Sequence, residues 1–366
     1  MQKSKSAPDY ILLLTTLTLL SIGVIMVYSA SAAWAEYRFE DSFFFLKRQL
    51  FFAGVGVTLM IFIMKVEYWT WRTYAKLILI VCFLLLLLVL VPGVGLVRGG
   101  ARSWLGVGAF SIQPSEFMKM GMAIFLARYL SENQKRIVSF KKGLLPNLAL
   151  VMSGFALIML QPDLGTGAVM VGTCVVMIFV SGARVSHFLW LGVVGLLGFV
   201  GLIASAPYRI QRITSFLDPW SDPLGSGFQI IQSLYAIGPG GLMGLGFGDS
   251  RQKYFYLPEP QTDFIFAILS EELGFIGGCL ILTLFGILLW RGVRAALAAP
   301  DLYGSLLAAG IVTMIAIQVM INIGVVSGLM PVTGITLPLL SYGGSSLTLM
   351  LVSIGILLNI SRHARW

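Results

Sequence analysis

Charged residues are the scarcest class in this 366-residue chain, making up 11% of the positions, whereas soluble domains carry about a quarter. Hydrophobic residues occupy 57% of the positions, and the mean hydropathy is +0.90. This composition excludes a soluble globular domain and predicts an all-α polytopic membrane protein. The net charge of +9 therefore reflects membrane topology, since no basic run interleaved with aromatic residues indicates nucleic-acid binding.

Histidine and cysteine are also scarce. The only histidines are His187 and His363, which sets aside a histidine-based metal site. Cys82, Cys174 and Cys279 all lie in apolar runs, so we expect buried thiols and neither a disulfide framework nor a metal site. The chain also lacks the glycine–lysine P-loop motif, which excludes an ATP-driven pump with its own nucleotide site.

Long apolar runs are abundant instead. A helix needs about 20 mostly apolar residues to span a bilayer, and we find ten candidates, of which the second and fourth are short. The first run follows Lys3 and Lys5 and is too long for a signal-peptide core, so we interpret it as a retained span. A single membrane domain over residues 1–366 is predicted, with spans at 10–33, 49–64, 76–96, 115–130, 144–161, 164–183, 185–206, 264–290, 302–326 and 343–361.

Lysine and arginine are concentrated in alternate connections, which the positive-inside rule places in the cytoplasm. The densest cluster is QKRIVSFKKG at 134–143, and an even span count puts both termini on that side. One connection of the opposite, outer face, 207–262, is far longer than a turn requires. Pro331, Gly334 and Pro338 predict an irregular segment after the ninth span. The outer connections are 31–48, 92–114, 162–163, 207–262 and 327–342.

Asp263 follows a polar, proline-broken stretch and opens an apolar run in KYFYLPEPQTDFIFAILSEELG. An aspartate at a helix start accepts backbone N–H bonds and complements the helix dipole, so position alone favours a capping role. The functional alternative is a general base that takes a proton from a hydroxyl at the membrane surface. Glu271 and Glu272 lie about two turns further along, and at least one should face the protein interior.

Two further sites of charge have both a structural and a functional interpretation. Glu116 and Lys119 share one helix face, either as a local ion pair or with the lysine facing an anionic substrate. Asp163, in QPDLGTG, suits a turn or an ion site. The glycine-rich stretch 238–248 predicts a flexible or re-entrant loop, with a phosphate cradle as the weaker alternative.

Four arginines are expected on the outer face. Arg98 and Arg102 precede Trp104, and Arg209 and Arg212 open the long connection. Such arginines either anchor to lipid headgroups, beside an aromatic belt that Trp104 would join, or clamp a pyrophosphate. Because nucleotide sugars and ATP are cytoplasmic, an outer site needs an activated substrate carried by lipid, such as a polyprenyl-pyrophosphate sugar.

The chain resembles the SEDS family, the shape, elongation, division and sporulation proteins. The resemblance covers essentially the whole chain in matching order, and it looks closest to the division-type branch and to sporulation members that serve the endospore cortex. The strings that carry it are RSWLGVGAFSIQPSEFMK, QPDLGTG, PYRIQRITSFLDPWSDPLGSGFQIIQSLYAIGPGGLMGLGFGDSRQKYFYLPEPQTDFIFAILSEELG and MPVTGITLPLLSYGGSS.

The resemblance implies ten helices and an inverting glycosyltransferase that polymerises lipid II. The C4 hydroxyl of one N-acetylglucosamine would attack the anomeric carbon of another substrate's N-acetylmuramic acid, and undecaprenyl pyrophosphate would leave. The family's essential acid maps onto Asp263, which shifts the interpretation from cap to general base. Glu116 and Lys119 match the family's PSE-x-x-K motif and Trp104 its RSW motif, and with the four arginines they form the expected substrate and pyrophosphate site.

The family also implies a class B penicillin-binding protein as partner, and a multi-pass location in the bacterial cytoplasmic membrane with an outward-facing site. In a sporulating cell this would be the outer forespore membrane. No cofactor is expected to be required, and a divalent cation, Mg²⁺ or Mn²⁺, remains open. Structural or supporting roles are expected for Asp163, Glu271, Glu272 and Ser341.

Two alternatives belong to other functional classes. A lipid II flippase would predict a coupling-ion site near the midplane and paired helix interruptions in the two halves. A non-catalytic scaffold that activates the penicillin-binding protein would predict that Asp263→Asn leaves function intact.

Overall fold

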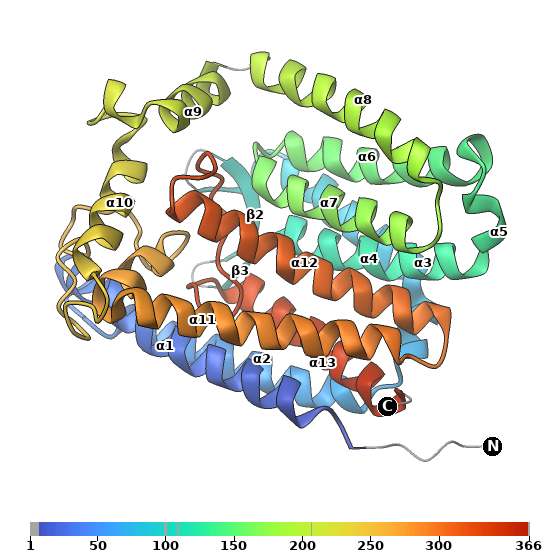
Figure 1. Ribbon diagram of the computed structural model, residues 1–366, viewed down its shortest axis with the longest axis horizontal. Helices are drawn as coiled ribbons and strands as arrows, with labels where there is room; N and C mark the ends of the chain where they lie inside the picture. The colour runs from blue at the N-terminus through green and yellow to red at the C-terminus, as the bar shows by residue number, and fades with distance from the viewer. Residues whose placement is uncertain (1–6, 99–100, 108–109, 206, 365–366) are drawn as a thin grey trace.

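The computed structural model describes residues 7–98, 101–107, 110–205 and 207–364 (Figure 1). Its long helices lie along one direction and alternate in sense, so the connections gather at two opposite ends. Each of the ten predicted spans has a helix. The helices are α1 (Tyr10–Phe39), α2 (Phe44–Lys65), α3 (Tyr68–Leu90), α4 (Pro114–Glu132), α6 (Leu145–Met159), α7 (Leu164–Val180), α8 (Val185–Ala204), α11 (Ile265–Leu297), α12 (Leu302–Val326) and α13 (Gly344–His363).

Seven helical segments of the described residues are long and apolar enough to cross a membrane, as the composition predicted. Another helix, α7, is apolar but shorter, with 17 residues. The total of ten spans remains a prediction. The seven segments are α1, α2, α3, Phe140–Met159, α11, α12 and α13.

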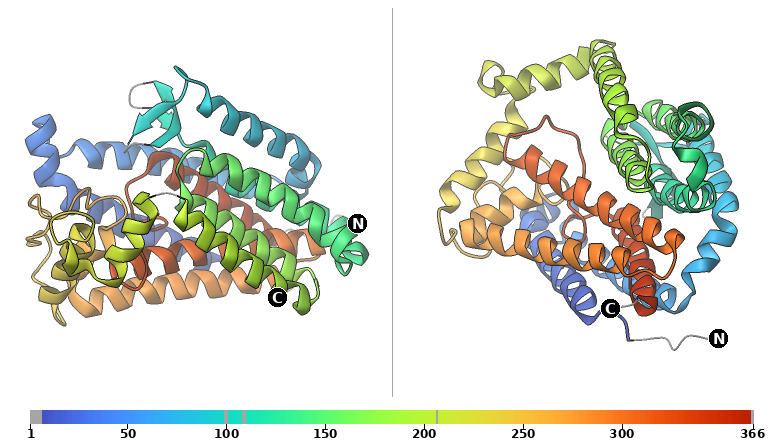
Figure 2. Two further views of the ribbon diagram at one scale, coloured as in Figure 1. Left: turned by 90° about the horizontal axis from the view of Figure 1, so that it is seen from above. Right: turned by 45° about the vertical axis from the view of Figure 1, so that its right-hand side comes forward.

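The two ends of the bundle differ in character. At one end α1 starts beside the end of α13: the Asp9 N–H donates to Ser361 Oγ over 3.1 Å, and Asp9 pairs with Arg291 at 2.7 Å. We call the opposite end the loop end. It carries a small sheet, α9 (Pro207–Leu217), α10 (Phe228–Gly240) and the segments 241–264 and 327–343 (Figures 1 and 2).

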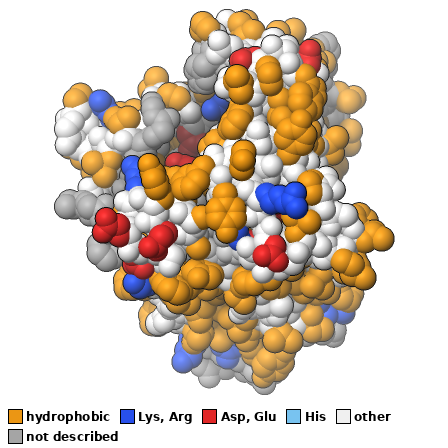
Figure 3. All heavy atoms as spheres, turned by 90° about the vertical axis from the view of Figure 1, so that its left-hand side faces the viewer, with side chains coloured by type: hydrophobic (Ala, Val, Ile, Leu, Met, Phe, Trp, Pro, Cys, Tyr) orange, Lys and Arg blue, Asp and Glu red, His pale blue; other side chains and the backbone are white. Residues whose placement is uncertain are grey.

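The loop end includes the irregular chain between α12 and α13. As the prolines predicted, α12 ends at Val326 and α13 begins at Gly344, with irregular chain between them. Viewed from this side, the surface shows many apolar side chains with acidic and basic ones scattered among them, and acidic atoms are set back in a recess (Figure 3). Helix α8 runs along the outside of the bundle toward α9 (Figures 1 and 2).

The connection 92–114 contains a three-stranded antiparallel sheet that the sequence did not predict. Ser103 and Leu105 are buried, whereas Arg102 and Trp104 are partly exposed, which is the alternation of a half-buried strand. The strands escaped prediction because β1 and β3 have only three residues each and because β2 buries a serine and leaves a tryptophan partly exposed. They are β1 (Leu96–Arg98), β2 (Ala101–Val107) and β3 (Phe110–Ile112), in the order β1-β2-β3.

Helix α11 is broken at Gly274, whose φ of 67° and ψ of −166° lie outside the helical region. The glycine-rich segment inserts at this break, where a Cβ on Gly244 would lie 2.1 Å from the carbonyl of Glu272. The re-entrant segment therefore supplies hydrogen-bond partners to the backbone groups that the break leaves unpaired. The N–H groups of Leu245 and Gly246 are used in these bonds, so they are not available to a phosphate cradle. The four backbone bonds are Leu245 N–H to Glu271 O (2.9 Å), Gly246 N–H to Glu272 O (3.1 Å), Phe275 N–H to Gly241 O (2.9 Å) and Ile276 N–H to Leu242 O (3.2 Å).

Candidate active site

Asp263 does not cap α11, which corrects the interpretation from position alone. The helix begins at Ile265, and Phe264 occupies the capping position without a side-chain hydrogen bond. Asp263 is partly buried, and its Oδ1 accepts a hydrogen bond from the Thr262 hydroxyl at 2.9 Å. Burial raises the pKa of the Asp263 carboxyl to about 6, although the Thr262 hydrogen bond and the positive charge of Arg212 oppose this shift. A carboxyl group with this pKa can accept a proton near neutral pH.

Hydrogen bonds to backbone carbonyls join the turn that carries Asp263 to α12 and to segment 327–343. The Tyr342 N–H donates to the Gln261 carbonyl at 2.8 Å. The Asn322 Nδ2 donates to the carbonyls of Asp263 and Ile335, at 2.7 and 2.8 Å. Asn322 was not among the predicted site residues, although an amide inside an apolar run such as VMINIGVV is a signal that could have identified it.

Glu116 and Lys119 form the ion pair that their spacing predicted. Lys119 Nζ lies 2.8 Å from Glu116 Oε1, and the side chains are 4% and 11% exposed, respectively. The pair lies in the first two turns of α4. Its contact with a substrate remains a prediction.

Asp163 has a structural role at the start of α7. Its Oδ1 accepts from the Thr166 N–H at 3.1 Å, which caps the helix. Its Oδ2 accepts from Gln113 Nε2 at 2.9 Å and from the Ser115 hydroxyl at 3.0 Å. These bonds join the start of α7 to the start of α4, next to Glu116, and they favour the predicted turn over an ion site.

The irregular stretch 333–335 lies between the start of α7, where Asp163 is, and the turn that carries Asp263. The start of α7 packs against it so closely that a Cβ on Gly165 would lie 2.8 Å from both the Thr333 carbonyl and the Ile335 side chain. On its other side, the Ile335 carbonyl shares Asn322 Nδ2 with Asp263. The Asp163 region and the Asp263 turn therefore flank the same stretch.

Glu271 and Glu272 both face the interior, which confirms the expectation that at least one would. Glu271 accepts from the Ser250 hydroxyl at 2.5 Å and from the Arg251 N–H at 2.9 Å. Glu272 accepts from Ser29 Oγ at 2.6 Å and pairs with Lys253 Nζ at 3.1 Å. Both glutamates thus hold the loop that follows the glycine-rich segment, and the sequence did not predict the part played by Lys253.

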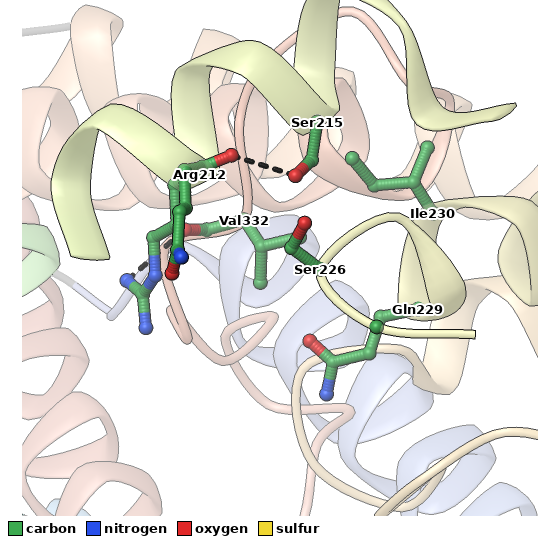
Figure 4. A pocket seen from close by; sticks show the side chains of 8 residues that line it. Arg212, Ser215, Ser226, Gln229, Ile230 and Val332 are labelled. Carbon is green, nitrogen blue, oxygen red and sulfur yellow. Dashed lines mark hydrogen bonds between the residues drawn. The ribbon is translucent and has the colours of Figure 1, made fainter. Parts of the chain in front are cut away.

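The predicted arginines are distributed over two regions. The side chains of Arg98 and Arg209 lie outside the described residues, and Arg102 is partly buried beside Trp104 on β2. Arg212 is exposed on α9 and donates to the Val332 carbonyl at 3.2 Å. It lines a pocket of about 270 Å³ with Gln211, Ser215, Ser226 and Gln229 (Figure 4).

Ser341 makes two hydrogen bonds within and beside the irregular segment. Its hydroxyl accepts from the Leu337 N–H at 2.8 Å, and its carbonyl accepts from Gln49 Nε2 at 3.2 Å. Within the part of the chain that the structure describes, no group of three or more His, Cys, Asp or Glu side chains is arranged to hold a metal ion.

This combination of a polytopic bundle and charged side chains at its loop end has known counterparts. The cell cycle protein family of FtsW, RodA and SpoVE matches residues 10–366. The chain belongs to this family. Members of the FtsW/RodA/SpoVE family with high similarity include the stage V sporulation protein E of Bacillus subtilis, 72% identical over 366 residues and the full length of both chains. A probable peptidoglycan glycosyltransferase FtsW from a Geobacter species is 43% identical and covers 98% of this chain and 97% of its own length.

Solved structures show the same family fold. One chain comes from a study of the structural coordination of polymerization and crosslinking by a peptidoglycan synthase complex. It is 36% identical with a TM-score of 0.79 and covers 97% of this chain and 98% of its own. The rod shape determining protein RodA of Thermus thermophilus is 32% identical with a TM-score of 0.73 and covers 98% of each chain.

Proposed function

We propose that this FtsW/RodA/SpoVE family member is a peptidoglycan glycosyltransferase. It polymerises lipid II into β-1,4 glycan strands at the outer face of the bacterial cytoplasmic membrane and releases undecaprenyl pyrophosphate. The observation that carries this proposal is Asp263: an aspartate at a helix start that does not cap the helix and whose pKa burial raises to about 6. The relatives named as glycosyltransferases support it.

In this mechanism the Asp263 carboxylate takes the proton from the C4 hydroxyl of the acceptor sugar. The hydroxyl oxygen forms a bond to the donor's anomeric carbon as the bond to the pyrophosphate oxygen breaks, which inverts the α-linkage to β. The leaving pyrophosphate carries away the bonding electron pair, and cationic side chains stabilise its charge. Lys119, Arg102 and Arg212 are the candidates whose side chains the structure describes, and Arg98 and Arg209 are also candidates.

The partner and the biological setting are part of the same proposal. A solved relative that belongs to a peptidoglycan synthase complex supports a class B penicillin-binding protein as the partner. The sporulation protein relative supports a role in the spore cortex, at the outer forespore membrane. The chain would act as one membrane domain without a required cofactor, and assistance by Mg²⁺ or Mn²⁺ is a question for assays with and without chelator.

The decisive experiment is lipid II polymerisation in detergent by the purified protein with its partner, comparing wild type with Asp263→Asn. The partner carries an inactivated transpeptidase site, so that glycan strand length alone is measured. We expect polymer from the wild type and none from the variant, with equal yields of folded protein.

The other outcomes identify the competing functions. Equal polymer from both proteins would remove Asp263 from the base role and direct the search to Glu116, Glu271 and Glu272. Polymer from neither, under conditions where a related polymerase is active, would favour a lipid II flippase or a scaffold for the penicillin-binding protein.

A further inference from the structure

Asn322 is a buried amide in the middle of an otherwise apolar stretch of α12. Its side chain is 1% exposed, and the neighbouring residues in sequence are hydrophobic or glycine. Burying an amide costs free energy unless its polar atoms find partners. Its Nδ2 has two: the Asp263 carbonyl at 2.7 Å and the Ile335 carbonyl at 2.8 Å.

The chemistry of these partners determines how the amide is oriented. Both partners are carbonyl oxygens, which only accept, so the NH₂ group must face them and both of its protons are used. The opposite atom, Oδ1, is buried and has no hydrogen-bond partner among the described residues. The amide thus binds two carbonyls from separate segments, and the stability of α12 alone does not require either contact.

We infer that Asn322 is a positioning residue that sets the place of the Asp263 carboxylate by holding its backbone carbonyl against segment 327–343. This inference rests on the proposed function, because it matters only if Asp263 is the base. The hydrogen bond from the Tyr342 N–H to the Gln261 carbonyl also holds the turn, but it joins two backbone groups. Asn322, by contrast, holds the turn through its side chain, so a substitution at this position can release the Asp263 carbonyl.

Release of the turn would change both the position and the surroundings of the carboxylate. The groups that influence its charge are the Thr262 hydroxyl, Glu259 and Arg212, and burial has the largest effect, raising its pKa. A base is active when deprotonated, so activity falls as the pH drops through its pKa. Greater exposure would lower that pKa toward the ordinary aspartate value, and the acidic limb of the pH–rate profile would move to lower pH.

The test compares Asn322→Leu, which keeps the branched shape of the side chain without donors, with Asn322→Ser, which keeps one hydroxyl donor. Asn359 provides a matched control, since it is also 1% exposed and its Nδ2 holds the Met64 carbonyl at 2.8 Å, but at the opposite end of the bundle. For each folded protein, kcat and KM for lipid II polymerisation are measured from pH 5 to pH 8.

We expect Asn322→Leu to lower kcat by about 10- to 100-fold, the cost of a misplaced catalytic group, with KM changed less and the acidic limb moved to lower pH. Asn322→Ser should show the same shift to a smaller extent. Asn359→Leu should lower thermal stability without moving the limb.

An unshifted acidic limb in both Asn322 variants, whatever their rate, would overturn the positioning role. Should Asn322→Leu fail to fold, Asn322→Ser alone is judged by the same criterion. The proposed function is tested separately, since it fails if wild type makes no polymer or Asp263→Asn retains full activity.

Discussion

The starts of α7 and α11 are built from similar sequences and use their aspartates differently. Asp163 follows Gln161 and Pro162, and Asp263 follows Gln261 and Thr262. α7 begins at the residue after Asp163, whose side chain reaches the Thr166 N–H, whereas α11 begins two residues after Asp263 and is not capped by it. One residue of difference in the helix start decides whether the carboxylate caps the helix.

The two carboxylates also differ in their hydrogen-bond partners. Asp163 accepts three hydrogen bonds, from Thr166, Gln113 and Ser115, so its oxygens are engaged in joining α7 to α4. The Asp263 side chain accepts one from Thr262, and the turn around it is held through backbone carbonyls instead. An acidic side chain that is positioned by its backbone keeps its oxygens accessible for proton transfer.

The largest expected effect is on Asp263 itself. Asp263→Asn should lower polymerisation at least roughly 100-fold, because an amide cannot accept the hydroxyl proton. Strand length on gels measures the rate, and size-exclusion chromatography checks folding. Activity within a few-fold of wild type would remove Asp263 from the base role and leave both aspartates with structural roles only.

Lys119→Met should lower activity by about tenfold or more, and Glu116→Gln should be milder. Removing one member of a buried pair leaves the other charge unpaired and is expected to destabilise the fold by about 3–5 kcal/mol. The double variant, with neither charge, separates stability from function. If it regains both melting temperature and activity, the pair is structural; recovery of stability alone would assign Lys119 to the substrate.

Asp163→Ala should act mainly on stability. Loss of the cap costs about 0.5–2 kcal/mol, and leaving Gln113 and Ser115 without their acceptor adds about 1–3 kcal/mol for each unsatisfied group. A lower melting temperature in detergent and only a few-fold loss of activity are expected at a temperature where the variant is folded. A loss of activity as large as that of Asp263→Asn, in a protein of unchanged melting temperature, would contradict this division of roles.

The pH dependence follows from the environment of Asp263. Because burial raises its pKa to about 6, the base is mostly deprotonated at pH 8, and activity should halve near pH 6 and fall further below it. Initial rates of polymerisation across this range measure the limb. The same limb in Asp163→Ala would show that Asp163 is not its source, as expected if it belongs to Asp263, whereas its loss in that variant would assign it elsewhere.

The smallest effect is expected for Arg212→Lys. Lysine keeps the positive charge near Asp263 but lacks the guanidinium fork. If Arg212 only anchors to lipid headgroups and to the Val332 carbonyl, activity should stay within about threefold of wild type, as judged by initial rates. A larger loss, mainly in KM, would indicate bidentate contact with the pyrophosphate.

Much of the fold followed from patterns that are local in sequence. Apolar runs predicted a helix for each of the ten segments, and Pro331, Gly334 and Pro338 predicted the irregular segment after α12. The spacing of Glu116 and Lys119 predicted their ion pair. The sheet at 96–112 was missed because β1 and β3 have only three residues each and because β2 buries Ser103 while it leaves Trp104 partly exposed, so its alternation in burial is not an alternation in polarity.

The sequence by itself determined the membrane character, the helical segments and the residue types available for chemistry, because these depend on hydrophobicity and on spacing along one helix. Tertiary structure alone decided how the charges are used. Lys253 meets Glu272 and Ser29 in the loop that follows the glycine-rich segment, which enters the break at Gly274. Likewise, Asp263 is held by an amide 59 positions away. Such contacts depend on the packing of distant segments, which no local pattern specifies.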